Sequence, residues 1–585
     1  MSQSPLLEPQ DNNNTLTDPT LGSSGLIVRQ IGQELQHDEP IQYGSINQDI
    51  EHQHLNIDPQ QELVKLEIDE IDPFTIKIII SSLLLGSFLS ALDTTIVTTL
   101  LTTIASDINA LSKMQWIATS YFLSCSAFQP LYGKLSDIFG RKPLLIFSNL
   151  SFAIGCLLCG IANDLLTISI GRFITGIGAG GLTMVGTVTI SDIIPLRKRG
   201  VYQGLGNIAF GLGAASGGLL GSIFEKLFNW QAAFLFQVPI ALISAIITWR
   251  NLNLPKGSPG LGIKGSKFDK LKQVDFLGSF LLVTSLLSFM ILVSFIGKSI
   301  EINSILFWIL IILTIIPLLT FNYVELYIAS TPIIPVRLLL QRTVLSSSLI
   351  NWFMSMAVFT YMFYLPVFWS SVLRLTPTEI GIRTISNFVG VSFGSFFAGI
   401  YMKRTGKYLW LSILTGFTTV LGALAIYSNT KDSPLWFQYI ELFIPGASYA
   451  ALLTTTLLAL IAAVPHDQQA STTSIQYAFR ATGSTIGVSA ASFIFQYYLS
   501  KSLNDKLFKI PSNFNKDEIY QIINKSLESS EYTWEAPKIF RDAIIDSYDF
   551  STHKALFFAL ICAIIAWGFS LFMKEHHLHS SINRK

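Results

Sequence analysis

Charged residues are scarce in this chain of 585 residues: Asp, Glu, Lys and Arg make up 13% of it, against roughly 25% in soluble domains. Cysteine is also scarce, and all four cysteines lie inside apolar runs. Cys156 and Cys159 have the spacing of a metal or redox pair, but no second ligand pair lies nearby, so we expect them to pack inside a helix bundle. Walker phosphate-binding loops and sets of His and Glu within apolar runs are missing too. The sequence therefore disfavours an ATP-driven pump and an enzyme, and it predicts neither a metal nor a cofactor.

The first 74 residues lack both apolar periodicity and positive charge. They hold fourteen acidic residues and only two basic ones, Arg29 and Lys65, so this segment carries a net charge of −12 and the remainder +13. Segments with little apolar surface and high net charge do not fold, so we predict a disordered, acidic cytosolic tail over 1–74. No basic region followed by an apolar region opens the chain, so no cleaved signal peptide is expected.

Apolar sequence, by contrast, is abundant. Half of the residues are hydrophobic, and the mean hydropathy is +0.49. A helix that crosses a membrane needs about 20 apolar residues, and runs of this length recur from residue 76 onward. They predict an all-α membrane protein with fourteen transmembrane helices. The predicted spans are about 76–103, 114–133, 143–162, 165–190, 202–224, 232–253, 275–297, 304–327, 343–372, 379–402, 409–428, 435–463, 470–499 and 552–573.

Lysine and arginine are unevenly divided between the two sides of these spans. With the N-terminus in the cytosol, the short cytosolic loops hold 17 bases and the short loops opposite hold 6. Basic residues accumulate in cytosolic loops, so we predict that both termini are cytosolic. A polar loop at about 500–551 then faces the lumen or the exterior. Its sequon Asn524-Lys525-Ser526 predicts N-glycosylation at Asn524.

The loop between the second and third spans runs from Gly133 to Lys142 as GKLSDIFGRK. Gly133 and Gly140 permit turns and close packing where a side chain would obstruct. Asp137 can form a charge-assisted pair with Arg141, and such a pair at the membrane surface can hold one face of a transporter closed. The segment is similar to the G-x-L-x-D-r-x-G-r-k loop of major facilitator transporters; the alternative is an ordinary charged loop between spans.

Two internal correspondences suggest that spans 9–14 repeat spans 1–6. Gly399–Lys407 copies the loop above but lacks its acid. Gly213 and Gly217 in span five correspond to Gly483 and Gly487 in span thirteen. Such repeats form two six-helix bundles with the substrate site between them, so spans seven and eight are an inserted pair. The predicted organisation is a tail at 1–74, a bundle at 75–253, a linker with two extra spans at 254–342, a bundle at 343–573 and a cytosolic tail at 574–585.

Ionisable groups inside spans are costly, at about 2.5–3.5 kcal/mol each on insertion scales, and so indicate function. Asp93 in span one and Arg172 in span four lie at depths compatible with an ion pair. An aspartate in an apolar setting whose partner can leave is able to carry a proton, so we assign proton coupling to these two residues and count Asp93 among the substrate candidates. The alternative is a permanent, structural ion pair.

Other polar positions in the spans are candidates for contact with the substrate. Arg480 in span thirteen can neutralise a carboxylate of the substrate. Glu441 and Glu325 lie closer to span ends, so simple interfacial exposure explains them at least as well as a contact with the substrate does. Asp192 is expected to pair with the bases at 197–199. Four further side chains are expected to line a cavity or, as is more frequent, to make interhelical hydrogen bonds: Asn207, Gln237, Tyr361 and Gln476.

Span five carries a glycine series at Gly213, Gly217, Gly218 and Gly221. Small residues at these spacings permit close contact between helices. The series is similar to a pattern that marks antiporters among facilitator exporters. It departs from that pattern at Gly218, where the pattern has proline, and at Ser222, where it has glycine.

The loop at Gly133–Lys142, the glycine series of span five and several shorter segments resemble the fourteen-span drug:proton antiporters. Within that family, part of the chain resembles the fungal vacuolar basic amino acid transporters. The resemblance implies an exchange of lysine, histidine or arginine for protons at the vacuolar membrane. The alternatives are a plasma-membrane multidrug exporter and a nutrient sensor that does not transport. We expect a monomer in the lipid bilayer with a small-molecule substrate and protons as partners, and no nucleic acid. The broader resemblance rests on the Gly133–Lys142 loop, the glycine series of span five, Leu92–Val97 and Ile168–Gly178, and the narrower one on Gln129–Asp137, Ser191–Ile193, Arg199–Gly204 and Gln237–Pro239.

Overall fold

The structure is a computed structural model that describes residues 72–578 of the chain. The predicted acidic tail, apart from its last three residues, and the chain from 579 onward lie outside the described residues. Short stretches inside the range are also left out: 111–113, 255–258, 264, 296–299, 301–303, 330, 335, 466–467, 512–513 and 529–531.

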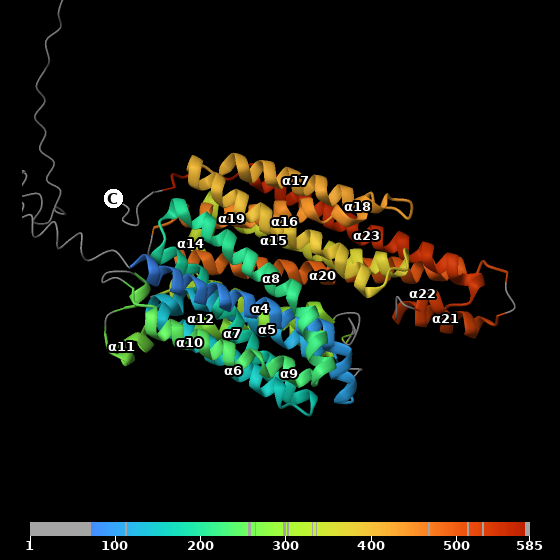
Figure 1. Ribbon diagram of the computed structural model, residues 1–585, viewed down its shortest axis with the longest axis horizontal. Coiled ribbons are helices and arrows are strands. Elements are labelled where there is room, and N and C mark those ends of the chain that lie inside the picture. Colours follow the sequence, from blue (N-terminus) through green and yellow to red (C-terminus); the bar gives the residue numbers. More distant parts are fainter. Residues whose placement is uncertain are drawn as a thin grey trace, which may run out of the picture. The chain divides into compact units, whose positions relative to one another are not determined.

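Helices dominate the secondary structure of the described residues, which confirms the prediction of an all-α protein (Figure 1). The first part of the chain forms α4 (Pro73–Asp107), α5 (Gln115–Phe139), α6 (Arg141–Gly160), α7 (Leu165–Ile193), α8 (Leu196–Leu227), α9 (Trp230–Leu235), α10 (Gln237–Asn251), η2 (Pro259–Leu261), α11 (Lys267–Lys272), α12 (Phe276–Phe295) and α13 (Ile305–Tyr327). The second part forms α14 (Val336–Leu339), α15 (Arg342–Ser371), α16 (Pro377–Thr405), α17 (Leu409–Tyr427), α18 (Leu435–Ile440), α19 (Phe443–Ala463), α20 (Gln469–Leu507), α21 (Lys516–Glu528), α22 (Tyr532–Glu535) and α23 (Lys538–Ser570).

Local sequence signals set several of the helix ends. Asp72 caps α4 by accepting a hydrogen bond from the Thr75 amide, with proline at the first helical position. Thr376 and Glu379 form a capping box at the start of α16. The same helix ends at Gly406, whose φ of 69° lies in the left-handed region that favours glycine.

Twelve of the described helical segments are long and apolar enough to cross a membrane. Helices also occupy the second and thirteenth predicted spans, but α5 and α20 are not among the twelve. These two helices pack against each other, and a methyl group at Gly133 of α5 would overlap Ser474 of α20. Because part of their surface faces another helix instead of lipid, they tolerate small and polar residues. The count of fourteen spans therefore stays a prediction.

The long helices pack in two groups that meet along two seams. The N-terminal group consists of α4–α10, and the C-terminal group of α15–α20 and α23. One seam joins α5 to α20, and the other joins α8 to α16. Helix α12, which pairs with α13, packs on α5 and α20 beside the first seam. We call the end of the groups that carries the junctions α5–α6, α7–α8 and α16–α17 the motif end.

The polar segment predicted at about 500–551 between spans thirteen and fourteen is helical over most of its described length. Helix α20 continues to Leu507, and α21, α22 and the first turns of α23 follow. Figure 1 shows α21 and α22 at the opposite end of the molecule from α11. Charged residues concealed an amphipathic pattern here, because Ile519, Ile522 and Ile523 of α21 are buried in one core with Leu503 of α20.

Candidate functional site

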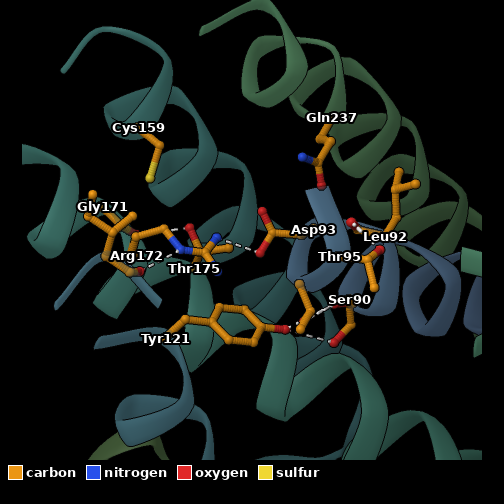
Figure 2. Close-up of polar contacts among 12 residues, drawn as sticks. Ser90, Leu92, Asp93, Thr95, Tyr121, Cys159, Gly171, Arg172, Thr175 and Gln237 are labelled. Carbon is orange, nitrogen blue, oxygen red and sulfur yellow. Dashed lines mark hydrogen bonds and ion pairs between the residues drawn. The ribbon is translucent and has the colours of Figure 1, made fainter. Parts of the chain in front are cut away.

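A fully buried ion pair joins α4 to α7. The Arg172 Nη1 atom lies 2.6 Å from Asp93 Oδ2, and the two side chains are 1% and 0% exposed. Figure 2 shows the guanidinium and the carboxylate pointing toward each other across the gap between their helices. The other carboxylate oxygen, Asp93 Oδ1, has no hydrogen-bond partner among the described residues. Asp93 and Arg172, which the sequence placed at compatible depths, therefore form an ion pair. One carboxylate oxygen of Asp93 remains without a hydrogen-bond partner among the described residues.

Tyr121 of α5 extends this cluster, and the sequence analysis missed it. Its hydroxyl donates to the Ser90 carbonyl oxygen at 3.1 Å (Figure 2), and its ring lies 4.5 Å from the guanidinium carbon of Arg172. A cation over an aromatic face is stabilised by the ring, so Tyr121 helps to hold Arg172 near Asp93. A tyrosine in an apolar run gave no signal in the sequence, because its partners lie on α4 and α7.

Gln237 is also buried, at the break between α9 and α10 inside the sixth predicted span. Its Nε2 atom donates to the Ala233 carbonyl at 3.0 Å. Its Oε1 atom has no partner among the described residues. Figure 2 draws this side chain in the same region as Asp93, but the structure records no contact between the two.

The glycine series of α8 packs on the part of α4 that carries Asp93. A Cβ at Gly213 would overlap the Phe88 carbonyl, and one at Gly217 would lie 2.7 Å from the Leu92 carbonyl. A Cβ at Gly218 would lie 3.2 Å from Thr99 Oγ1, a tight contact, whereas Gly221 faces Leu100 with ordinary space. Glycine thus brings α8 onto the α4 backbone on either side of residue 93.

The C-terminal group repeats this contact between α20 and α15. A Cβ at Gly483 would meet the backbone of Trp352, and one at Gly487 would meet the backbone of Met356. The two partners lie four residues apart, as Phe88 and Leu92 do in the N-terminal group. The two glycine pairs therefore play the same packing role in both groups.

Replacing Gly217 with alanine should reduce transport at least tenfold. The added methyl group would collide with Thr95 and the Leu92 carbonyl, and the displacement of α8 would reach the turn that carries Asp93. Gly206→Ala on the same helix is the matched control, because nothing lies within 4 Å of its added methyl group. Substrate uptake per amount of folded protein measures the effect. Wild-type uptake by Gly217→Ala would show that transport does not need this contact.

The loop between α5 and α6 contains a buried charge cluster. Arg141 Nη1 lies 2.7 Å from Asp137 Oδ1, and Arg141 Nε lies 2.8 Å from Asp192 Oδ2. Asp192 therefore pairs with Arg141, and the prediction that it pairs with the bases at 197–199 is wrong. The reason is topological: the end of α7 meets the start of α6 within the N-terminal group. One guanidinium thus bridges two carboxylates.

The segment Pro259–Ile263, which follows α10, lies over this loop. The Ile263 amide donates to the Ile138 carbonyl at 3.0 Å. A Cβ at Gly140 would lie 2.8 Å from the Leu261 carbonyl, and the φ of Gly140 is +98°. Gly140 is therefore required both for its conformation and for the approach of a second backbone. Lys142 points away from the cluster and donates to Asn253 at 2.9 Å.

The hydrogen bonds that join the two groups come from the half of the molecule nearer the motif end. Arg197 Nε donates to the Lys403 carbonyl at 2.9 Å. Farther in, Asn207 Nδ2 donates to Ser395 Oγ at 2.7 Å, and the hydroxyls of Thr187 and Tyr477 lie 2.8 Å apart. The groups are thus fastened together at this end.

A small pocket lies between the groups, beyond these contacts. Arg480, a substrate candidate from the sequence, lines it. Asn207 and Gln476, which were expected to line a cavity or to make interhelical hydrogen bonds, also line it, and Tyr477 stands beside Gln476 on α20. The lining residues are Gln203, Asn207, Leu453, Leu457, Gln476, Tyr477 and Arg480.

The remaining candidates lie outside this pocket. Tyr361 is buried in the core of the C-terminal group, with no partner for its hydroxyl among the described residues. Glu441 is buried at the junction of α18 and α19, where Asn429 Nδ2 donates to it at 2.8 Å. Glu325 is also buried, and it accepts from the Ile333 amide at 3.0 Å, so interfacial exposure, the alternative considered for both acids, is wrong.

The described residues form neither a nucleophile elbow nor a metal-binding cluster. Residues 390–394 read GVSFG, the spacing of a hydrolase nucleophile elbow, which places its serine on a strand-to-helix turn. Ser392 instead lies inside α16 and donates to the Phe388 carbonyl at 3.0 Å. Among the described residues, no three His, Cys, Asp or Glu side chains are grouped to hold a metal ion.

Comparison with known proteins agrees with this helical architecture. The chain matches the Major Facilitator Superfamily over residues 83–488. "Multidrug resistance protein fnx1" of Schizosaccharomyces pombe is 36% identical over 86% of this chain and 94% of its own length. "Vacuolar membrane amino acid uptake transporter fnx2" of the same yeast is 34% identical, covering 86% of this chain and 84% of its own. "Vacuolar basic amino acid transporter 1" of Saccharomyces cerevisiae is 33% identical, covering 77% and 84%.

Solved structures share the fold at low identity. The proton:xylose symporter XylE aligns with a TM-score of 0.53 at 13% identity, over 87% of this chain and 98% of its own. The human organic anion transporter MFSD10 aligns with a TM-score of 0.52 at 14% identity, over 84% and 99%. Identities this low show the fold alone. The family match and the curated relatives settle the membership: this multi-pass membrane protein belongs to the Major Facilitator Superfamily.

Proposed function

We propose that this protein is a proton-coupled antiporter that moves basic amino acids, or similar small cations, from the cytosol into the vacuole. The observation that carries the proposal is the buried pair of Asp93 and Arg172, whose carboxylate keeps one oxygen without a partner. Buried charges in spans mark ion and proton pathways. In this scheme, Asp93 takes a proton when Arg172 moves away and releases it when the pair forms again.

The proposed topology has fourteen spans in the order 6+2+6 with both termini in the cytosol. The N-terminal group supplies the first six spans, α12 and α13 the inserted pair, and the C-terminal group the last six. The motif end then faces the cytosol. This agrees with the basic residues at its three junctions, which are among the 17 bases counted in the cytosolic loops. The hydrogen bonds near this end correspond to a state that is closed toward the cytosol.

Coupling is proposed to pass from Asp93 through the glycine contacts to the seam. Gly213 and Gly217 place α8 directly on the turn of α4 that carries Asp93. The same α8 contributes Asn207 to the pocket and to the hydrogen bond with Ser395 across the seam. Formation or loss of the buried pair would therefore shift a helix that belongs to both the substrate pocket and the closed end.

The proposed substrate and location rest on relatives. Two of them are named as vacuolar amino acid transporters and are 34% and 33% identical to this chain. The test is uptake of labelled lysine, histidine and arginine into vacuolar vesicles from cells with and without the gene. Uptake that needs the gene and stops with a proton uncoupler supports the proposal, and uptake unaffected by the uncoupler refutes proton coupling.

A second candidate is a multidrug:proton exporter at the plasma membrane. The observation in its favour is the 36% identity to a protein named for multidrug resistance. The same cells decide between the two. Loss of resistance to toxic cations together with unchanged vacuolar amino acid uptake would favour the exporter.

The proposed orientation predicts a glycan at Asn524. This side chain is exposed on α21, at the end of the molecule remote from the motif end. Asn524→Gln should therefore abolish the gel shift that a glycosidase produces in the wild-type protein. A wild-type shift that survives in Asn524→Gln would place the glycan elsewhere, and a glycan at Asn13 would reverse the orientation.

A further inference from the structure

The pocket at the seam has one charged lining residue among those described, and that charge is not neutralised by another side chain. Arg480 is half-buried in α20 and has no hydrogen bond or ion pair to another described residue. Its guanidinium carbon lies 5.4 Å from the ring centroid of Tyr477, and this ring is fixed from the other side by the hydrogen bond to Thr187. An arginine over an aromatic ring keeps its N–H groups available to bind a carboxylate.

A buried acceptor stands one helical turn before this arginine. Gln476 is 5% exposed, and its Nε2 atom is held at 3.3 Å from both Asn351 Oδ1 and Thr456 Oγ1. Its Oε1 atom has no partner among the described residues. A buried acceptor without a donor is unfavourable, so a ligand that brings an N–H group here is favoured.

These two observations define a ligand with an anion and a hydrogen-bond donor close together. Side chains four residues apart on a helix have Cβ atoms about 5–6 Å from each other. The carboxylate and the ammonium of an α-amino acid sit on one carbon, so they suit a donor and an acceptor at this spacing.

We propose that this pocket binds the zwitterionic head of an α-amino acid, with Arg480 on the carboxylate and Gln476 Oε1 on the ammonium. The assignment rests on the proposed transport of amino acids and adds the groups that recognise them. No acidic side chain lines the pocket among the described residues. The positive side chain of a basic substrate is therefore not selected by charge here, and the head alone supplies the affinity of this subsite.

The pocket also places the bound head against both groups. Gln203 and Asn207 come from α8, and Gln476 and Arg480 come from α20. A ligand that fills the space contacts both sides of the seam near the hydrogen bond between Asn207 and Ser395. Binding at this subsite is thereby linked to the position of the two groups.

The test measures ligand-induced thermal stabilisation of the purified full-length protein with four probes. L-lysine and L-leucine carry the whole head, cadaverine lacks the carboxylate, and 6-aminohexanoic acid lacks the α-ammonium. Lysine and leucine should both stabilise the protein, and the two truncated probes should require at least tenfold higher concentrations. Equal stabilisation by cadaverine and lysine, or no response to either amino acid, would overturn the assignment.

Variants separate the two recognition groups. Arg480→Gln and Gln476→Leu should each weaken lysine binding at least tenfold, and Arg480→Lys should restore part of it. Arg250→Gln, at an exposed position on α10, is the matched control and should bind as wild type does. Lysine uptake into vesicles by the same protein tests the transport proposal separately. Uptake without head-selective binding refutes only the pocket assignment, whereas head-selective binding without uptake of any basic amino acid refutes only transport.

Discussion

Asp93→Asn should abolish the proton-driven accumulation of substrate. An amide side chain cannot exchange a proton in this pH range, so the variant has no group to carry protons in place of Asp93. A one-for-one exchange can sustain about a tenfold substrate gradient per pH unit, since one unit is worth about 1.4 kcal/mol. The accumulation ratio of the variant should fall to one. Exchange of substrate down its own gradient is expected to persist, because asparagine resembles the protonated aspartate in shape and charge.

Vesicle uptake under an imposed pH gradient, together with counterflow without a gradient, measures both effects. Asp432→Asn is the control, since Asp432 is exposed in the segment between α17 and α18. Removing one partner of a buried ion pair destabilises proteins by about 3–5 kcal/mol, so the amount of folded protein is measured as well. Asp93→Asn with Arg172→Gln leaves no unpaired charge, and it should still lack accumulation.

Asp93→Glu keeps a titratable group and should retain part of the coupling with a shifted pH optimum. Accumulation by Asp93→Asn that still stops with an uncoupler would show that another group carries the proton. The buried carboxylates Glu441 and Glu325 would then be the next to test. Glu441 has precedence, because it lies within the C-terminal group, whereas Glu325 lies on α13 outside both groups.

The sequence was sufficient to identify the candidate residues whose placement inside a membrane span costs free energy. Asp93 and Arg172 are expensive in any span, and helix geometry alone placed them at matching depths. The glycine pairs on α8 and α20 were likewise visible, because their spacing repeats. What they touch was not visible, since Phe88 and Trp352 lie on other helices, more than a hundred residues away in the chain.

Partners chosen by tertiary packing could not be predicted in the same way. Asp192 is five residues from Arg197 in the sequence but binds Arg141, because the end of α7 packs beside the start of α6. Tyr121 gained its importance only from the arginine that α7 brings to it. The helices in the segment 500–551 were not predicted, because its charges lie on the exposed side of helices whose apolar side is buried.

Arg141→Gln should reduce transport at least tenfold, and more than any other change in the α5–α6 loop. Arg141 is 1% exposed and bridges Asp137 and Asp192, so its loss leaves two facing carboxylates without their cation. Asp137→Asn should have a smaller effect, because Arg141 keeps its contact with Asp192. Lys142→Gln is the control: its amine contacts only the exposed Asn253, and surface contacts of this kind contribute about 0–1 kcal/mol.

A cross-link can tell a gating defect from a folding defect in these variants. Arg197 Nε lies 2.9 Å from the Lys403 carbonyl across the seam between α8 and α16, so a short bifunctional thiol reagent should cross-link cysteines at these two positions in the state described above. If the charge cluster holds this end closed, Asp137→Asn should lower the cross-linking yield severalfold at unchanged protein level, since a bias of about 1 kcal/mol shifts two populations that much. Arg141→Gln should lower it further. Wild-type transport and cross-linking in both variants would mean that the cluster only supports the loop, and the closed state would then depend on the seam contacts of α8 and α16 themselves.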